Sequence, residues 1–417
     1  MNTIAMIVRR SLRQHALSTA VTVFSVALAG GLLMAVFAIK TQTHEAFTAG
    51  QTGYDAVLGA RGSQLQLVLN TVFHLETSPG NIPWQLYKDI KSDPRIKLAV
   101  PYAVGDNYQG FRIVGTTLEA FTAPVGREKG FRVEQGGRLF DPNAKEAVIG
   151  SFVSQKTGLT VGSTFNPYHG VFYDPKMRHA DVYTVTGVLA PTNTPCDRVV
   201  WIPIDGIYRM SGHVLRGTGK DFVATGDEAI PDASKEVSAV MIRLRAAQAG
   251  FMLDQTINKQ GKVATLAWPI GRVMAELFDK IGWMDKILAL IAMLVALVSG
   301  AAILASVYNT ISERRREFAI LRALGARKST VFSAIVLEAS AIAALGSLFG
   351  FIFYAVVVAV AAWVIRVQTG VVLDVARWNV AFLWTPIAMT LLGALAGVIP
   401  AFKAYATDVA ANLSPIS

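Results

Sequence analysis

Four long apolar stretches constrain this chain more than any other feature. Residues 18–39, 287–308 and 380–402 carry no charge, and residues 331–365 carry only Glu338. A helix needs about 20 apolar residues to cross the hydrocarbon core of a bilayer, since each residue adds about 1.5 Å. Only 16% of all residues are charged, against about 25% in ordinary soluble domains. The sequence therefore predicts an integral membrane protein.

The third apolar stretch, residues 331–365, requires a decision about the number of spans. As a helix it would be roughly 52 Å long, which exceeds one perpendicular crossing but is too short for two crossings and a turn. We interpret it as one long, tilted or bent span. The four spans then leave residues 40–286 as one large polar segment between the first span and the last three, a 1+3 arrangement.

The distribution of basic residues predicts the orientation. Arg9, Arg10 and Arg13 precede the first span without an acidic residue, and the loop 309–330 holds six basic residues against Glu313 and Glu317. By the positive-inside rule, residues 1–17, 309–330 and 403–417 are cytoplasmic, whereas residues 40–286 and the loop 366–379 lie outside. The net charge of +10 is then mainly an orientation signal, and we expect no nucleic-acid partner. The first apolar run is too long for a typical signal peptide, so we expect an uncleaved anchor.

The outside segment is predicted to be an α+β domain in two lobes. Its helical ends, 41–47 and 271–283, continue into the first two spans without a flexible linker. Short β-rich runs bounded by turn residues predict strands at 54–58, 96–104, 111–114, 181–189, 198–202 and 238–244. Helices are predicted at 83–92, 144–157, 205–210 and 246–259.

The inner loop reads ERRREFAILRALGARKST from Glu313 to Thr330. Phe318, Ile320, Leu321 and Leu324 form an apolar face, basic residues form another, and Gly325 can end the helix. One interpretation is an interfacial helix that rests on anionic lipid headgroups.

The string ERRREFAILRALGA, the following VLEA with Glu338, and the order of one span, a large domain and three spans resemble permeases of the MacB/FtsX/LolC class, the type VII ABC transporters. The string EAVIGSFVSQKTGLTVGSTF at residues 146–165 is similar to the periplasmic domain of that family. The resemblance implies that the inner loop couples to a separate ATP-hydrolysing subunit, through Glu313, Arg314, Arg315, Arg316, Glu317, Phe318, Leu321, Arg322, Leu324 and Gly325.

The resemblance also implies a bacterial inner-membrane complex in which two permease copies, as a homodimer, sit on an ATPase dimer. ATP and Mg²⁺ would bind the ATPase, and this chain would bind no cofactor. ATP-driven movement would pass through the first two spans to the periplasmic domain, a mode of action called mechanotransmission. A periplasmic adaptor, a lipoprotein or an outer-membrane component are further candidate partners.

Two features within the spans are singled out. Gly346 and Gly350, and again Gly393 and Gly397, have the G-x-x-x-G spacing that permits close helix packing. Glu338 is an acid in a span, which often has a function such as proton coupling. It follows Lys328 by only ten residues, so we favour a structural role in which it reaches cytoplasmic water or pairs with a basic residue of the loop.

The sequence lacks the nucleotide-binding motif of an ATPase, and its candidate metal ligands are few. No G-x-x-x-x-G-K-[ST] loop is present to cradle nucleotide phosphates, so we expect that the chain is not an ATPase and that the energy comes from another chain. His169, His179, His213 and Cys196 lie within one 45-residue stretch and are weak candidates for metal ligands. Their spacing matches no known motif, so we expect no metal site and interpret the histidines as scattered surface residues.

The leading hypothesis is a permease subunit for extraction or export of a lipophilic, lipoprotein or periplasmic substrate. An FtsX-like regulator of a periplasmic cell-wall hydrolase is the alternative within the family. A membrane-anchored extracytoplasmic enzyme or receptor is the alternative outside it.

Overall fold

The computed structural model describes residues 3–48, 53–125, 130–226 and 228–406. The chain forms two compact units. One unit comprises Met1–Gln42, Ile281–Trp363 and Leu373–Ser417, and the other comprises Thr43–Lys280 and Val364–Val372. Most of the predicted tail, residues 407–417, lies outside the described residues.

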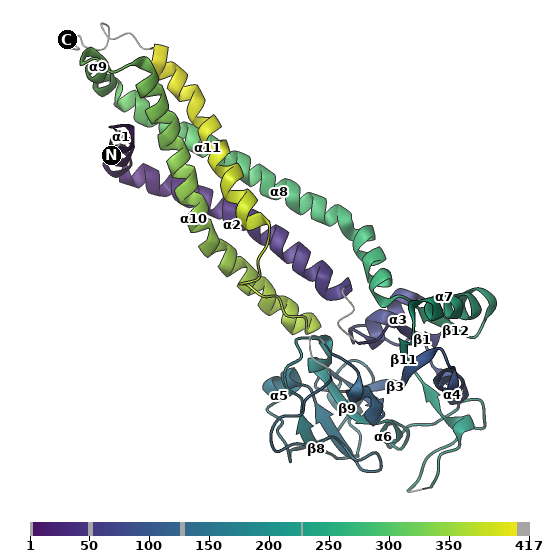
Figure 1. Cartoon of the computed structure of the whole chain (residues 1–417). Helices are drawn as coiled ribbons and strands as arrows, with labels where there is room; N and C mark the ends of the chain where they lie inside the picture. Colours follow the sequence, from purple (N-terminus) through teal and green to yellow (C-terminus); the bar gives the residue numbers. More distant parts are fainter. Residues whose placement is uncertain (1–2, 49–52, 126–129, 227, 407–417) are drawn as a thin grey trace. The chain divides into compact units, whose positions relative to one another are not determined.

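The first unit is built from helices (Figure 1). Four of the described helices are long and apolar enough to cross a membrane, and one of them precedes the sheet in the chain while three follow it. In hydrocarbon a chain must satisfy its backbone hydrogen bonds internally, which a helix does within one segment. The helices are α1 (Thr3–Gln14), α2 (Ala16–Thr48), α8 (Ile270–Glu313), α9 (Arg315–Ala323), α10 (Lys328–Thr369) and α11 (Ala381–Ala406), and one end of each of α2, α8 and α10 belongs to the second unit.

The long helices extend beyond the predicted apolar runs. α2 and α8 include the segments 41–47 and 271–283, so the prediction that these polar ends continue the helices is confirmed. The third run forms one helix, α10, as predicted. Its 42 residues leave several turns beyond what a crossing of about 20 residues requires.

The four glycines of the two G-x-x-x-G pairs lie at helix contacts within the chain. A Cβ atom on Gly346 would lie 2.5 Å from Cβ of Val26 on α2, and one on Gly350 would lie 3.1 Å from the nitrogen of Gly31. Gly393 and Gly397 on α11 face α10, where added Cβ atoms would lie 2.4 and 2.7 Å from Cβ atoms of alanines. Glycine at these positions allows α2, α10 and α11 to pack closely.

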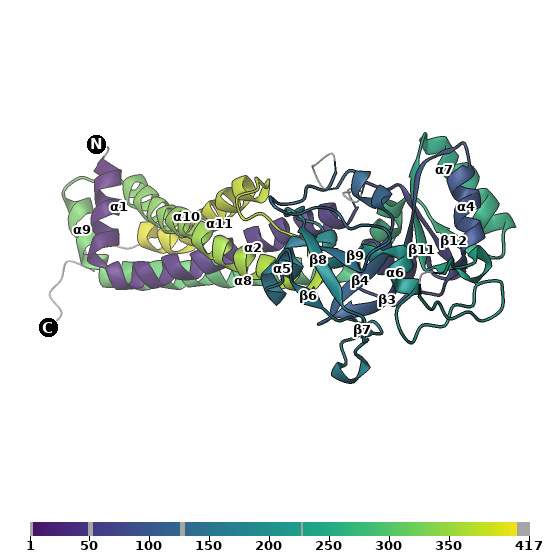
Figure 2. The same ribbon diagram turned by 90° about the horizontal axis from the view of Figure 1, so that it is seen from below.

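The second unit contains a mixed sheet of ten strands, in the order β12-β1-β11-β3-β4-β9-β5-β8-β6, with β7 paired to β3 (Figures 1 and 2). The central strand β3 pairs with β11 through its first half and with β4 and β7 through its second half. One sheet thus runs through the domain for which two lobes were predicted. The strands are β1 (Ala56–Ala60), β3 (Ile96–Tyr108), β4 (Phe111–Thr116), β5 (Glu146–Ile149), β6 (Thr164–Phe165), β7 (Tyr168–His169), β8 (Tyr183–Val188), β9 (Val199–Pro203), β11 (Ala239–Leu244) and β12 (Ala264–Ala267), and a separate pair joins β2 (Ile82–Pro83) to β10 (Glu236–Val237).

Both faces of the sheet are buried. Val200 and Ile202 of β9 belong to one hydrophobic cluster, whereas Val199 and Trp201 belong to another. This alternation follows from the two-residue period of a strand. The short helices that cover the sheet are α3 (Gln64–Thr71), α4 (Trp84–Ser92), α5 (Ser151–Thr157), α6 (Ile204–Tyr208) and α7 (Ala247–Asp254).

The six predicted strands are all present, and the helices predicted at 83–92, 205–210 and 246–259 are confirmed. The helix predicted at 144–157 is wrong in its first half, where β5 pairs with β8 and β9 and only α5 is helical. The apolar residues Ala147, Val148 and Ile149 of β5 are buried on both faces of the sheet, and a short continuous apolar run of this kind does not distinguish a strand from a helix.

Candidate functional site

The inner loop folds into a short helix, α9, between the long helices α8 and α10. Arg314 lies outside regular helical geometry, with φ of −99°, and thereby separates α8 from α9. After α9, Gly325 adopts φ of +97°, a left-handed conformation that glycine adopts without a steric penalty. The predicted helix and its glycine end are therefore present.

Arg314 is buried and joins three parts of the helical unit. Its Nη1 donates to Oγ of Ser11 on α1 at 2.6 Å and lies 3.6 Å from Oε2 of Glu338 on α10. Ser11 Oγ donates to Oε1 of Glu338 at 2.5 Å. Arg314 Nε also donates to Oε2 of Glu317 at 2.9 Å, and its guanidinium lies over the ring of Phe318. Glu338 thus pairs with a basic residue of the loop, which is the structural role that we favoured.

Ser11 was not singled out by sequence reasoning. It lies on α1, a basic amphipathic helix, three residues after Val8, and both side chains are buried. That spacing places both residues on one face of the helix and could have indicated that Ser11 is buried. Nothing local indicated that the partner would be Glu338, which is 327 positions away.

The predicted coupling residues divide into an inward and an outward group. Phe318 is buried in the helical core and Leu321 packs against the same core. Leu324 is 81% exposed and Ile320 is 45% exposed. The hydrogen bond from Arg314 holds the pKa of Glu317 below its usual value. The outward group of the predicted set is Glu313, Arg316, Glu317, Leu324 and Gly325; Arg322 is half-buried, and Arg315 begins α9.

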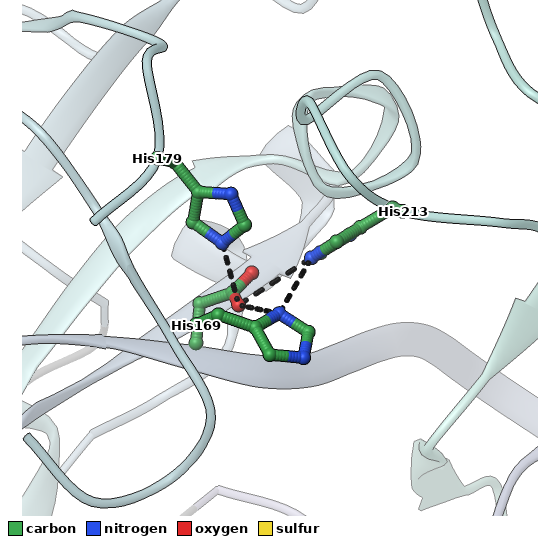
Figure 3. A group of neighbouring side chains, drawn as sticks. His169, His179 and His213 are labelled. Carbon is green, nitrogen blue, oxygen red and sulfur yellow. Dashed lines mark hydrogen bonds and ion pairs between the residues drawn. The ribbon is translucent and has the colours of Figure 1, made fainter. Parts of the chain in front are cut away.

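The second group of polar side chains lies in the sheet unit. Asp106 on β3 and His169 on β7 are direct partners across two antiparallel strands. His179 follows the short helical turn Pro175–Met177, and His213 follows α6. The ligand-type atoms of these four side chains all lie within 4.8 Å of one another, and the three imidazole rings point toward a common centre (Figure 3). We call this group the histidine cluster.

The carboxylate of Asp106 lies at the centre of the histidine cluster. Its Oδ1 lies 3.4 Å from Nδ1 of His169, 3.3 Å from Nε2 of His179 and 3.5 Å from Nε2 of His213. His169 Nδ1 lies 3.3 Å from His213 Nε2. Asp106 and His179 are buried, whereas the His169 side chain is half-exposed.

The backbone orients two of the imidazoles. His179 Nδ1 donates to the carbonyl of Ser211 and His213 Nδ1 donates to the carbonyl of Ile207, both at 2.8 Å. Because a carbonyl can only accept, these Nδ1 atoms carry hydrogens and the Nε2 atoms face Asp106.

The electrostatics of the cluster follow from these contacts. Burial alone would raise the pKa of Asp106, but the hydrogen bonds from His179 and His213 outweigh it and hold this pKa at about 2. The hydrogen bond to Asp106 raises the pKa of His179, and it does so for His213 against the opposing effect of burial.

The interpretation of the three histidines as scattered surface residues is therefore wrong. They converge because β7 pairs with β3 and because two loops return to the same edge, which sequence spacing does not reveal. The fourth candidate, Cys196, does not belong to the group. It packs against the hydrophobic core around Trp201, and burial raises the pKa of its thiol to about 12. Asp106 was missed because no local motif marks it.

Four membrane-length helices, a short helix between two of them and a large sheet domain define a multi-pass membrane protein with a large extracytoplasmic domain. The model of the MacB-like periplasmic core domain matches residues 19–250, more than half of the chain, and that of the FtsX-like permease C-terminal region matches residues 289–409. The chain therefore belongs to the MacB/FtsX family of ABC transporter permeases, as the inner-loop motif predicted.

Solved structures give weaker likenesses. The periplasmic region of MacB from Actinobacillus actinomycetemcomitans is 9% identical, with a TM-score of 0.35 over 57% of this chain and 98% of that one. The extracellular domain of the noncanonical ABC-type transporter YknZ from Gram-positive bacteria is 14% identical, with a TM-score of 0.29 over 51% of this chain and 99% of that one. No curated protein matches the chain. The family assignment rests on the two family models.

Proposed function

We propose that this chain is a non-catalytic membrane subunit that transmits the movement of a separate ABC ATPase to the extracytoplasmic sheet domain. The observation that carries the proposal is the division of α9 into two faces. Arg314 and Phe318 are buried in the helical unit, whereas Arg316, Glu317, Ile320 and Leu324 are exposed. A short helix that is attached on one side and carries exposed apolar and charged residues on the other has the form of a docking surface for a partner protein.

The attachment of α9 supports transmission of force. The Arg314 guanidinium contacts Ser11, Glu317 and Glu338, so a displacement of α9 acts on α1 and α10 together. α2 and α8 are each a single helix through the predicted spans and their polar extensions. Such helices resist bending far more than a Gly/Ser-rich linker does.

In the proposed complex the loop 309–330 and both termini face the cytoplasm of a bacterial inner membrane, and two copies of this chain bind an ATPase dimer. The ATPase supplies the sites for ATP and Mg²⁺. The size of the predicted outside segment, residues 40–286, favours a lipophilic, lipoprotein or periplasmic substrate over simple activation of a hydrolase. Co-purification with a periplasmic cell-wall hydrolase would favour the regulatory alternative.

Charge reversal on the exposed face of α9 tests the coupling. In membranes or nanodiscs containing both subunits, Glu317→Lys and Arg316→Glu are expected to reduce ATP hydrolysis to the rate of the ATPase alone. Arg314 is unsuitable for this test because it is buried. Lys97→Glu, which reverses an exposed charge in the sheet domain, is the matched control and should leave stimulation intact. Normal stimulation in both α9 variants would contradict the proposal.

The orientation is tested separately with Leu324→Cys. Leu324 is 81% exposed, so a cysteine there should react with a membrane-impermeant maleimide. The native Cys196 should contribute little labelling, because its raised pKa leaves the thiol protonated. We expect labelling in inverted vesicles and none in intact spheroplasts; the reverse pattern would place the loop outside.

A further inference from the structure

The histidine cluster has no role in the coupling described above. We propose that Asp106, His169, His179 and His213 bind one divalent transition-metal ion, with Zn²⁺ as the favoured ion, in a four-ligand site of the sheet domain. This departs from the sequence-based expectation that the chain binds no metal.

The distances within the cluster fit tetrahedral coordination. Zn²⁺ binds imidazole nitrogen and carboxylate oxygen at about 2.0–2.1 Å, so neighbouring ligand atoms of a tetrahedron are about 3.3–3.4 Å apart. The three distances from Asp106 Oδ1 to the ring nitrogens and the distance from His169 Nδ1 to His213 Nε2 range from 3.3 to 3.5 Å. The remaining pairs of ligand atoms stay within 4.8 Å. Small side-chain movements would therefore complete the tetrahedron.

The hydrogen bonds to the backbone direct lone pairs toward the centre. In neutral His179 and His213 the proton lies on Nδ1, because that atom donates to a carbonyl, so Nε2 carries a lone pair. A lone pair that faces the Asp106 carboxylate is repulsive unless a proton or a cation lies between them. A metal ion at the centre satisfies all four ligands at once, whereas protons would place several charged imidazoles around one carboxylate.

The second oxygen of the Asp106 carboxylate provides a further argument. Asp106 is fully buried, and its second oxygen, Oδ2, has no hydrogen-bond partner within the described residues. Burial of an unpaired carboxylate oxygen is costly. A cation bound at Oδ1 would neutralise the carboxylate charge and so reduce this cost.

A surrounding network holds the ligands in position. Asp181 accepts hydrogen bonds from the backbone nitrogen and hydroxyl of Ser211, at 2.8 and 2.7 Å, and the carbonyl of Ser211 orients His179. Asn107 donates to carbonyls of the loop after His169, including that of Gly170 at 2.8 Å. Partners of this kind fix ring orientation in metal sites.

The ligand set selects the class of metal. Three imidazoles and one carboxylate suit Zn²⁺, Cu²⁺ or Ni²⁺, whereas Mg²⁺ and Ca²⁺ prefer oxygen ligands. Four protein ligands complete the tetrahedral shell of Zn²⁺, as in structural zinc sites. The ion would join β3, β7 and the two loops that carry His179 and His213. His169 and His213 also line a cavity of about 370 Å³, through which an ion could enter.

Metal titration of the full-length chain in detergent tests the proposal. The chain should be purified without a polyhistidine tag, stripped with a chelator and titrated with Zn²⁺ against a chromophoric competitor. We expect one Zn²⁺ per chain and a higher unfolding temperature of the sheet domain. Co²⁺ in the same site should show the intense visible absorption of tetrahedral coordination. Absence of stoichiometric Zn²⁺ binding, or an octahedral Co²⁺ spectrum, would overturn the proposal.

Matched variants locate the site. His169→Ala removes a half-exposed ligand and should leave the fold intact, which circular dichroism can check. Loss of an outer partner alone typically costs 10–100-fold in metal affinity, so loss of this ligand, or of His179 in His179→Ala, should weaken Zn²⁺ binding by at least about tenfold. His44→Ala, which changes a histidine outside the cluster, should bind Zn²⁺ normally. Unchanged binding in a folded His169→Ala variant would also overturn the proposal.

Discussion

The helical unit and the sheet unit each bury a carboxylate, but they neutralise it in different ways. Glu338 is paired with Arg314 and Ser11, and the guanidinium keeps its charge at all relevant pH values. Asp106 is surrounded by three imidazoles, which can lose or gain protons or bind a metal. A partner that keeps its charge makes a permanent structural contact, whereas titratable partners make a site that can hold either protons or a metal ion.

Breaking the Arg314–Glu338 pair should have the largest effect on stability. Arg314→Ala leaves Glu338 buried without its cation, and such changes typically cost about 3–5 kcal/mol. Unfolding of the detergent-solubilised chain would measure the loss. The double variant Arg314→Met/Glu338→Leu removes both charges and should recover most of it. If Arg314→Ala were as stable as the wild type, the ion pair would contribute nothing to stability.

Removing the Asp106 charge should lower the stability of the chain less than Arg314→Ala does. Asp106→Asn weakens hydrogen bonds to His179 and His213, a loss of about 1–3 kcal/mol, but the imidazoles can become neutral and so avoid an unpaired charge. The same unfolding assay, without metal, gives the comparison. A loss of stability larger than that of Arg314→Ala would show that the Asp106 carboxylate is the more important of the two for stability.

The pH dependence of metal binding sharpens the comparison further. Protons and Zn²⁺ compete for the same ring nitrogens, so binding should weaken as pH falls. Because the pKa values of His179 and His213 are raised, the affinity for Zn²⁺ should begin to fall at a higher pH than it does for free imidazole. Zn²⁺ titrations of the metal-free chain at several pH values would show this. Affinity that is constant across the imidazole range would argue against histidine ligands.

The smallest effect on stability is expected for Glu317, which accepts a hydrogen bond from Arg314. Glu317 is half-exposed, and exposed ion pairs contribute only about 0–1 kcal/mol. Its lowered pKa means that this contribution is present above its unfolded-state pKa and is lost as pH falls through the lower folded-state pKa. Glu317→Gln should therefore unfold almost like the wild type at neutral pH. A large loss would place Glu317 among the structural residues rather than on the docking face.

Much of the fold was predictable because its signals are local. Long apolar runs predicted the four helices, and short β-rich runs bounded by turn residues predicted strands such as β3 and β11. The segment of β5 failed because three buried apolar residues in succession carry no period. The pairing of Glu338 with a loop residue was expected because Lys328 is only ten residues away, but its link to Ser11 was not.

The sequence alone determined the class of this protein: apolar lengths matched to a bilayer, basic residues beside them and a long inner-loop motif are all properties of contiguous segments. Only the tertiary structure decided which side of α9 is buried and that Asp106 meets His169, His179 and His213. Those contacts depend on the register of β3 with β7 and on loops that return from distant positions. Strand pairing between remote segments is a cooperative property of the whole domain, and the spacing of histidines along the chain carries no record of it.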